Sequence, residues 1–212
     1  MTIKCLSFDL DGTLLLDESK RMDPRTVNSI QRAMAQGMHV VIASGRDKNG
    51  CKFVYEPLGL ENGNHFLALV NGQIIYDFEN KEYDLDDVLT TEDGIKIQKV
   101  CKEFGVEGIF QCGYDFYSYI SSLNRVKKKV KNAIFGELDD YGLKDGKENR
   151  NFIDLPFEEI RLTQDINKVI MVHSPRFFEK NFEGIKAALS DYDVLLIGPD
   201  WLEIMPKHVN KA

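Results

Sequence analysis

Two aspartates that stand two positions apart, Asp9 and Asp11, follow an apolar run near the start of the chain and precede Gly12 and Thr13. One carboxylate of such a pair can attack phosphorus, while the other protonates the leaving oxygen and later activates water. Gly12 permits a close backbone approach to phosphate, and the amides of the loop can form an anion-binding nest. The pattern therefore favours covalent phosphoryl transfer over the solvated turn that an isolated pair of acids usually makes.

The residues around these acids predict the elements that must position them. Residues 3–10 are predicted to form a strand buried on both faces, whose carboxyl end opens into the crevice where α/β sheets bind ligands. Asp23 and Pro24 are typical of a helix start, and Gly37 of its end. The apolar run 39–43 then closes a strand-helix-strand unit. We expect a doubly wound, Rossmann-like parallel α/β core.

Further along the chain, the pattern indicates a hairpin and then an inserted module. A third strand at 66–70 leads into Asn71-Gly72 and a hairpin partner at 74–76. From about residue 83 the mixture of amphipathic helices and short apolar strands predicts a small α/β insertion. We therefore expect core residues 1–82, an insertion over 83–200, and a return to the core over 201–212.

Composition limits the classes of function. The chain has 212 residues, 43% of them hydrophobic, with a formal net charge of −7, which argues against a nucleic-acid groove. Four widely spaced cysteines are expected to be free thiols. The first residues lack the apolar stretch of a secretory signal, and no run is long enough to span a membrane, so we expect a cytoplasmic protein without a membrane or nucleic-acid partner.

The segment Phe8-Asp9-Leu10-Asp11-Gly12-Thr13-Leu14 resembles the first motif of the haloacid dehalogenase superfamily of phosphatases, and more closely that of its Cof-like branch. The resemblance implies that Asp9 is the nucleophile and Asp11 the general acid and base. It also implies that Mg²⁺ binds the Asp9 carboxylate and the main-chain carbonyl of Asp11. The main chain at Leu10, Gly12 and Thr13 is expected to contact phosphate, and the insertion is expected to be a cap domain.

A second motif resembles the same family where the second predicted strand ends. There Ser44 would donate a hydrogen bond to a phosphoryl oxygen, beside Gly45, and Arg46 would approach the substrate or gate the cap. Asn71 resembles a family loop at the end of the third strand. For Asn71 the sequence leaves open whether it touches the substrate or only forms a turn.

The C-terminal passage, residues 201–212, resembles the approach to the third motif of the family. By that resemblance Lys211 neutralises charge on Asp9 and on the phosphoryl group as the transition state forms.

The chain departs from the family pattern at the fourth motif, Gly-Asp-x-x-Asn-Asp, which does not occur in it. We therefore expect a truncated product or a fragment that lacks the C-terminal part of the core. The loss of one carboxylate would weaken the magnesium site and compromise catalysis. The first strand would also have a free apolar edge, which favours self-association.

Taken together, these features predict a magnesium-dependent phosphomonoester hydrolase that acts through an aspartyl-phosphate on a small metabolite, such as a sugar phosphate or a phosphorylated cofactor. Two alternatives stay open. One is a catalytically silent remnant that still binds phosphate, and the other is a phosphomutase, because related folds share the first motif.

Overall fold

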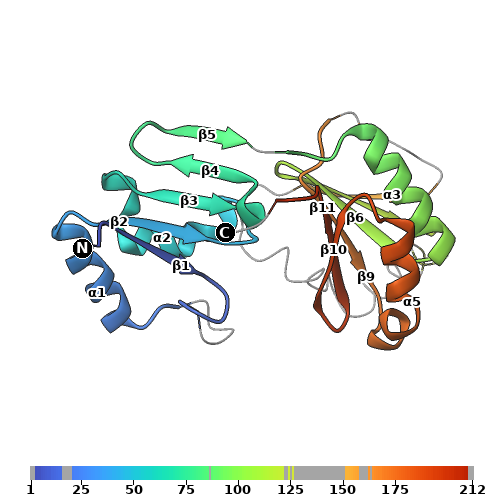
Figure 1. Cartoon of the computed structure of the whole chain (residues 1–212), viewed down its shortest axis with the longest axis horizontal. Coiled ribbons are helices and arrows are strands. Elements are labelled where there is room, and N and C mark those ends of the chain that lie inside the picture. Colours follow the sequence, from blue (N-terminus) through green and yellow to red (C-terminus); the bar gives the residue numbers. More distant parts are fainter. Residues whose placement is uncertain are drawn as a thin grey trace. The chain divides into compact units, whose positions relative to one another are not determined.

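The computed structural model describes residues 3–15, 21–85, 87–121, 124, 126, 151–157, 162 and 164–209. The chain forms two compact units, one of residues 1–87 with 209–212 and one of residues 88–208 (Figure 1). The boundaries expected at 82 and 200 therefore fall at 87 and 208. The hairpin strand that follows residue 81 still pairs within the first unit, and residues 201–205 pair within the second.

The first unit is built on a five-stranded sheet of order β1-β2-β3-β4-β5. Strands β1 (Cys5–Asp9), β2 (His39–Ala43) and β3 (Phe66–Leu69) are parallel. Strands β4 (Ile74–Asp77) and β5 (Glu82–Leu85) extend the sheet in antiparallel fashion. The parallel part confirms the predicted Rossmann-like core, and β5 is an added strand that the sequence pattern did not indicate.

Helix α1 (Pro24–Ala35) provides the crossover between β1 and β2. It begins as predicted, with the Asp23 carboxylate accepting a hydrogen bond from the Arg25 N–H at 2.8 Å and with proline in the first turn. The next crossover, to β3, contains α2 (Lys52–Leu58). The apolar faces of these helices meet the sheet in one core, which includes Ile30, Val40, Ile42, Val54, Leu58 and Leu67.

Strand β1 differs from its prediction in one respect. We expected a strand buried on both faces, but Cys5 and Ser7 are exposed, and Leu6 and Phe8 are half-buried. The prediction of two-sided burial is wrong because β1 stands at an end of the described sheet, with β2 as its neighbour there. A central strand has neighbours on both sides, whereas an end strand has one, so its side chains are less well covered.

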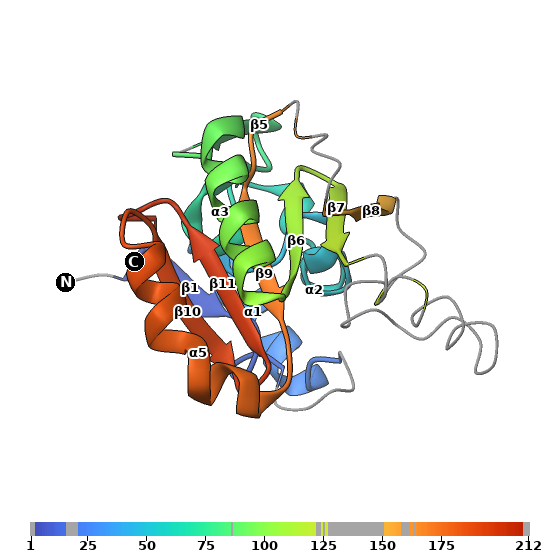
Figure 2. The same ribbon diagram turned by 90° about the vertical axis from the view of Figure 1, so that its right-hand side faces the viewer.

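The second unit contains a six-stranded sheet of order β10-β11-β9-β6-β7-β8. Its strands are β6 (Glu107–Cys112), β7 (Asp115–Ile120), β8 (Asn151–Pro156), β9 (Lys168–Val172), β10 (Asp193–Gly198) and β11 (Trp201–Met205). Helices α3 (Thr91–Phe104) and α5 (Pro175–Ala188) lie on the same face of this sheet (Figure 2). Their buried residues share one apolar core with the sheet. The predicted α/β insertion is confirmed in its composition of elements.

Some predicted features fall outside the described residues. Among them is Lys211, the residue that resembles the lysine of the family's third motif. Within the described part of the chain, no helix has the length and apolar character needed to cross a membrane.

Candidate active site

The predicted site residues of the first unit lie where its parallel strands end. Asp9 at the end of β1 is in register with Ala43 at the end of β2, and Ala43 is in register with Ala68 of β3. The loops that follow these strands therefore leave the sheet at one edge. This edge carries the Asp9–Asp11 loop, the Ser44–Arg46 loop and Asn71, as the sequence indicated.

A tight turn holds the two aspartates. The Gly12 N–H donates to the Leu15 carbonyl at 2.8 Å, and the Thr13 N–H donates to the Leu10 carbonyl at 3.4 Å. Gly12 has a φ of 78°, a backbone conformation that glycine adopts without strain, and Leu10 is fully buried beneath the turn. The N–H groups of Gly12 and Thr13 are thus used in hydrogen bonds within the turn. Contacts between phosphate and the main chain of Leu10, Gly12 and Thr13 stay predictions.

Arg46 forms a two-point ion pair with Asp11. Its Nη2 lies 2.9 Å from Asp11 Oδ1 and its Nε lies 3.2 Å from Asp11 Oδ2. Both side chains are partly exposed, at 30% for Arg46 and 59% for Asp11. The guanidinium carbon also lies 5.7 Å from the centre of the Phe53 ring, a cation–π arrangement that restrains it further. The sequence placed Arg46 near the substrate but did not indicate this pair.

Ser44 lies beneath the loop that carries Arg46. It is 1% exposed, its Oγ accepts a hydrogen bond from the Arg46 N–H at 3.2 Å, and its own N–H donates to the Ala68 carbonyl at 2.8 Å. Burial raises the pKa of the neighbouring Cys51 thiol to about 12, an effect that a hydrogen bond with Ser44 partly offsets. Ser44 therefore fixes the loop, and its contact with a phosphoryl oxygen stays a prediction.

Backbone hydrogen bonds join the loop after β3 to the loop after β2. The Val70 N–H donates to the Arg46 carbonyl and the Asn71 N–H to the Ser44 carbonyl, both at 3.0 Å. A Cβ atom added at Gly45 would lie 2.7 Å from Asn71 Oδ1, so the asparagine side chain would have to move to admit a larger residue. Val70 and Asn71 have φ values of 50° and 60°, which are strained for a β-branched residue and tolerated by asparagine. The structure thus gives Asn71 a positioning role, and a direct substrate contact stays open.

Two neighbours of Arg46 anchor its loop and were missed from the sequence. The Asp47 carboxylate accepts a hydrogen bond from the Gly50 N–H at 2.6 Å, and the Lys48 ammonium lies 3.6 Å from the centre of the Tyr76 ring. An aspartate that accepts a hydrogen bond from the N–H three residues later is typical of a helix start. The spacing of Asp47 and Gly50 could therefore have indicated this contact from the sequence. The contact between Lys48 and Tyr76 joins segments that are distant in the sequence, so no local pattern could indicate it.

The donor atoms at this edge fit Mg²⁺. Within the described residues, no group of three or more histidine, cysteine and acidic side chains could hold a metal ion. The Asp9 carboxylate and the Asp11 main-chain carbonyl nevertheless both supply oxygen, the ligand type that Mg²⁺ prefers. Mg²⁺ is also commonly held by one or two carboxylates together with water and phosphate. The site therefore provides a minimal donor set, which water or substrate oxygens would complete.

A family model described as haloacid dehalogenase-like hydrolase matches residues 6–212. The chain belongs to this family. Among curated relatives, this haloacid dehalogenase-like hydrolase is 29% identical over 221 residues to a Streptococcus pyogenes protein named "Putative phosphatase M6_Spy0533", a match that covers 100% of the chain and 73% of the relative. Over 75 residues it is 39% identical to a Bacillus subtilis 5-amino-6-(5-phospho-D-ribitylamino)uracil phosphatase, covering 35% of the chain and 28% of that enzyme.

Solved structures have the same fold as this family member. A haloacid dehalogenase-like hydrolase from Bacteroides thetaiotaomicron superposes with a TM-score of 0.74 at 21% identity, covering 99% of this chain and 73% of the other. A sugar phosphatase of the superfamily, BT4131, superposes with a TM-score of 0.69 at 18% identity, covering 98% of this chain and 72% of the other. The chain thus spans about three quarters of these relatives, and the similarity confirms a Rossmann-like core with an inserted α/β unit.

Proposed function

We propose that this haloacid dehalogenase-like hydrolase is a phosphomonoester hydrolase that acts on a small phosphorylated metabolite, with Asp9 as nucleophile. The observation that carries the proposal is the convergence of two loops at one edge of the sheet, where Arg46 from one loop pairs with Asp11 from the other. The names of the relatives support the class of substrate, since the Bacillus subtilis relative is named as the phosphatase of a phosphorylated ribitylaminouracil. A sugar phosphate or a phosphorylated cofactor fits this class.

The reaction is proposed to have two steps. In the first, an oxygen of the Asp9 carboxylate attacks phosphorus, the bond from phosphorus to the ester oxygen breaks, and the leaving oxygen takes a proton from Asp11. In the second, the Asp11 carboxylate takes a proton from water, the resulting hydroxide attacks phosphorus, and the bond to Asp9 breaks. Inorganic phosphate leaves, Asp9 is regenerated, and Asp11 has its proton back.

The remaining residues are proposed to bind the metal ion, to neutralise charge and to orient the reacting groups. Asp9 and the main-chain carbonyl of Asp11 would hold Mg²⁺, which when bound supplies positive charge against the phosphoryl oxygens. The Ser44 hydroxyl would orient the phosphoryl group, and Lys211 would neutralise developing charge. Arg46 would hold the ionised form of Asp11 in place for its role as a base, and one of its two hydrogen bonds would have to open when Asp11 carries the proton that it gives to the leaving oxygen.

The test is the hydrolysis of an aryl phosphate in the presence of Mg²⁺ by the whole chain and by Asp9→Asn. This variant keeps the shape of the side chain but loses the nucleophile, so we expect turnover to fall by roughly a thousandfold or more, as for loss of other covalent nucleophiles. The control is Asp84→Asn, the same change at an exposed position on β5, which should leave turnover unchanged.

Two results would count against the proposal. Equal turnover by the wild type and Asp9→Asn would exclude Asp9 as the nucleophile. Phosphate binding by the wild type without any metal-dependent turnover would favour the silent binding protein. A phosphomutase would instead be revealed by transfer of phosphate to a second hydroxyl of an added sugar phosphate.

A further inference from the structure

The ammonium group of Lys48 lies on a cluster of aromatic rings from the hairpin of β4 and β5. Its Nζ is 3.6 Å from the centre of the Tyr76 ring and 5.9 Å from the centres of the Phe78 and Tyr83 rings. The centre of the Tyr76 ring lies 5.0 Å from that of Phe78 and 4.7 Å from that of Tyr83. Because the faces of aromatic rings attract a cation, these contacts hold the side chain of Lys48 on the hairpin.

The cluster is a firm support for this lysine. Tyr76 and Phe78 are only 6% and 4% exposed, and both belong to the core of the first unit. Lys48 itself is half-buried. A cation–π contact strengthens as the cation is removed from water, so this one should exceed a contact made on an open surface.

Lys48 also begins the helical segment that leads into α2. Its carbonyl accepts a hydrogen bond from the Cys51 N–H at 3.1 Å, and α2 starts at the next residue. Within α2, the Tyr55 ring packs on the Phe78 ring, with centres 5.1 Å apart. The hairpin thus holds this segment at two points, residues 48 and 55, and Phe53 lies between them.

Phe53 connects this segment to the ion pair at the site. Its ring centre lies 5.7 Å from the guanidinium carbon of Arg46, which donates hydrogen bonds to both carboxylate oxygens of Asp11. A shift at the start of the segment would therefore move the ring relative to the guanidinium. We propose that Lys48 is a positioning residue, which holds the start of this segment on the hairpin and so keeps Arg46 in place beside Asp11. This inference rests on the function proposed above for Asp11.

The variant Lys48→Met tests whether the contact matters for the reaction. Methionine keeps a long side chain without the charge, whereas Lys48→Arg keeps a cation on the rings. For an aryl phosphate with Mg²⁺, we expect kcat to fall about threefold in Lys48→Met, with a smaller change in KM, and to stay near the wild-type value in Lys48→Arg. The matched control is Lys186→Met, which removes an exposed lysine 5.8 Å from the Phe182 ring on α5 and should change neither quantity.

A double variant separates positioning from the general effect of a positive charge near phosphate. If Lys48 acts through Arg46, Lys48→Met should lower kcat no further in an Arg46→Met background. A direct attraction between Lys48 and the substrate would persist in that background and would raise KM. Equal fold losses of kcat in both backgrounds, or a wild-type kcat in Lys48→Met, would overturn the proposal.

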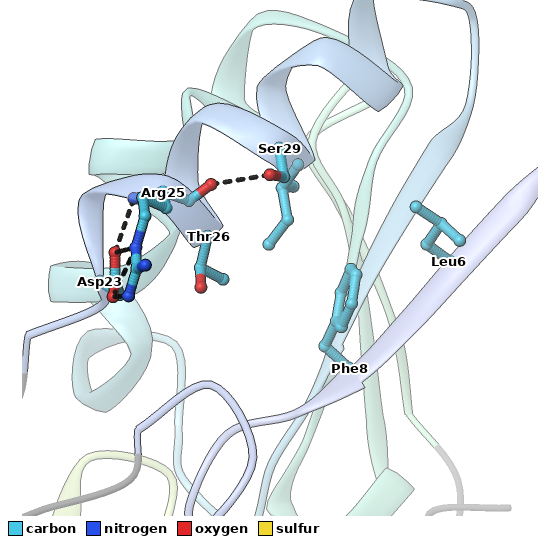
Figure 3. Close-up of a pocket in the computed structure, with 7 residues that line it drawn as sticks. Leu6, Phe8, Asp23, Arg25, Thr26 and Ser29 are labelled. Carbon is cyan, nitrogen blue, oxygen red and sulfur yellow. Dashed lines mark hydrogen bonds and ion pairs between the residues drawn. The ribbon is translucent and has the colours of Figure 1, made fainter.

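Chemical modification of arginine gives a readout that does not need turnover. Phenylglyoxal reacts with guanidinium groups, and mass spectrometry of the peptides measures the rate at each arginine. We expect Arg46 to react about threefold faster in Lys48→Met than in the wild type, because its ion pair is less well held. Arg25 is the matched control, since it forms a two-point ion pair with Asp23 at the start of α1 (Figure 3) and should react equally in both proteins.

The two readouts distinguish a failure of this proposal from a failure of the proposed function. An unchanged rate of modification at Arg46 in Lys48→Met would overturn the positioning role, whatever the turnover. Faster modification of Arg46 without turnover by any of these proteins would confirm that Lys48 holds Arg46 and would count against the proposed hydrolase activity instead.

Discussion

Arg46 donates hydrogen bonds to both carboxylate oxygens of Asp11, from Nη2 at 2.9 Å and from Nε at 3.2 Å, although it lies 35 residues further along the chain. The pair joins the loop after β1 to the loop after β2. Because both side chains are partly exposed, the pair adds little to stability. Its value lies in the orientation of Asp11, the residue proposed to exchange protons with the leaving oxygen and with water.

The first prediction concerns this pair. Arg46→Lys keeps the positive charge but loses the planar fork, so Asp11 is held at one point rather than two. We expect kcat/KM for an aryl phosphate to fall about tenfold, or ~1.4 kcal/mol, with little change in the melting temperature. Arg32→Lys, on the exposed side of α1, is the control and should change neither quantity. Unaltered kinetics of Arg46→Lys would show that the pair does not orient Asp11.

A second prediction follows from the contact between Gly45 and Asn71. Gly45→Ala would bring a Cβ to 2.7 Å from Asn71 Oδ1, so the asparagine must move. We expect a loss of about 1–3 kcal/mol in the free energy of unfolding, as for other overpacked sites. The double variant Gly45→Ala/Asn71→Gly removes the clashing atom and keeps a residue that adopts the φ of 60° at position 71 without strain, so it should recover most of this loss in urea unfolding. Losses that simply add would mean that the two residues are not coupled.

A third prediction uses the backbone of Val70. Its φ of 50° lies in the left-handed region, and its side chain is 1% exposed. Val70→Ala and Val70→Gly both remove the buried side chain, but only glycine also relieves the backbone strain, which is about 1–2 kcal/mol. Val70→Gly should therefore be more stable than Val70→Ala, the reverse of the usual order. Chemical denaturation measures the free energy of unfolding of both variants. If Val70→Ala were as stable as Val70→Gly or more stable, the backbone at position 70 would not be strained.

Local patterns predicted much of the fold because they were strong where the core is formed. The apolar run at β2 and the cap at Asp23 depend on neighbouring residues, and both are found where they were expected. The short helix α2 carries Pro57 within it, which weakens a helical pattern. Strand β5 has only four residues, all of them exposed, so its pattern is too short to indicate a strand. The partial exposure of β1 depends on which strands stand beside it, and the apolar pattern of residues 3–10 alone does not record that.

At the site, residue types and their spacing predicted which residues gather at the ends of the strands. The spacing could not predict how they contact one another, because these contacts join distant segments. The ion pair between Arg46 and Asp11 depends on the side-by-side register of β1 and β2. The close approach of Asn71 to Gly45 likewise depends on the turn after β3.

A fourth prediction concerns the thiols. Burial raises the pKa of Cys51, Cys101 and Cys112 to about 12, whereas Cys5 is exposed. At pH 8 only about one in ten thousand of the buried thiols is then ionised, so a thiol-specific reagent should titrate one cysteine rapidly and the others only on unfolding. Cys5→Ser should abolish the rapid phase. Rapid reaction of a second thiol in the folded protein would contradict this assignment.

The same pKa values fix the sign of a pH effect on stability. In the unfolded chain these thiols release their protons near pH 8.5, whereas in the folded protein they keep them until about pH 12. The unfolded state therefore binds fewer protons between these values, and the free energy of unfolding should decline as the pH rises above about 8.5. Replacing Cys51 by alanine should reduce this decline when urea unfolding is measured at pH 8 and pH 10.

The last prediction concerns a buried ion pair in the second unit. Lys168 Nζ lies 2.6 Å from Glu203 Oε1, and the two side chains are only 7% and 8% exposed. Lys168→Met leaves the Glu203 carboxylate buried without the ammonium, and we expect a loss of about 3–5 kcal/mol in the free energy of unfolding. The control is Lys96→Met, which breaks an exposed pair with Glu92 and should cost less than ~0.5 kcal/mol.

Neutralising both partners separates the charge from the packing. In Lys168→Met/Glu203→Gln no charge remains at the pair, and the amide oxygen at position 203 can still accept the hydrogen bond that Trp201 Nε1 donates at 3.3 Å. The double variant should therefore regain most of the stability that Lys168→Met loses in urea unfolding. If the double variant were as unstable as Lys168→Met, the unpaired charge of Glu203 would not be the cause of the lost stability. The loss would then come from the packing of the methylene groups of Lys168.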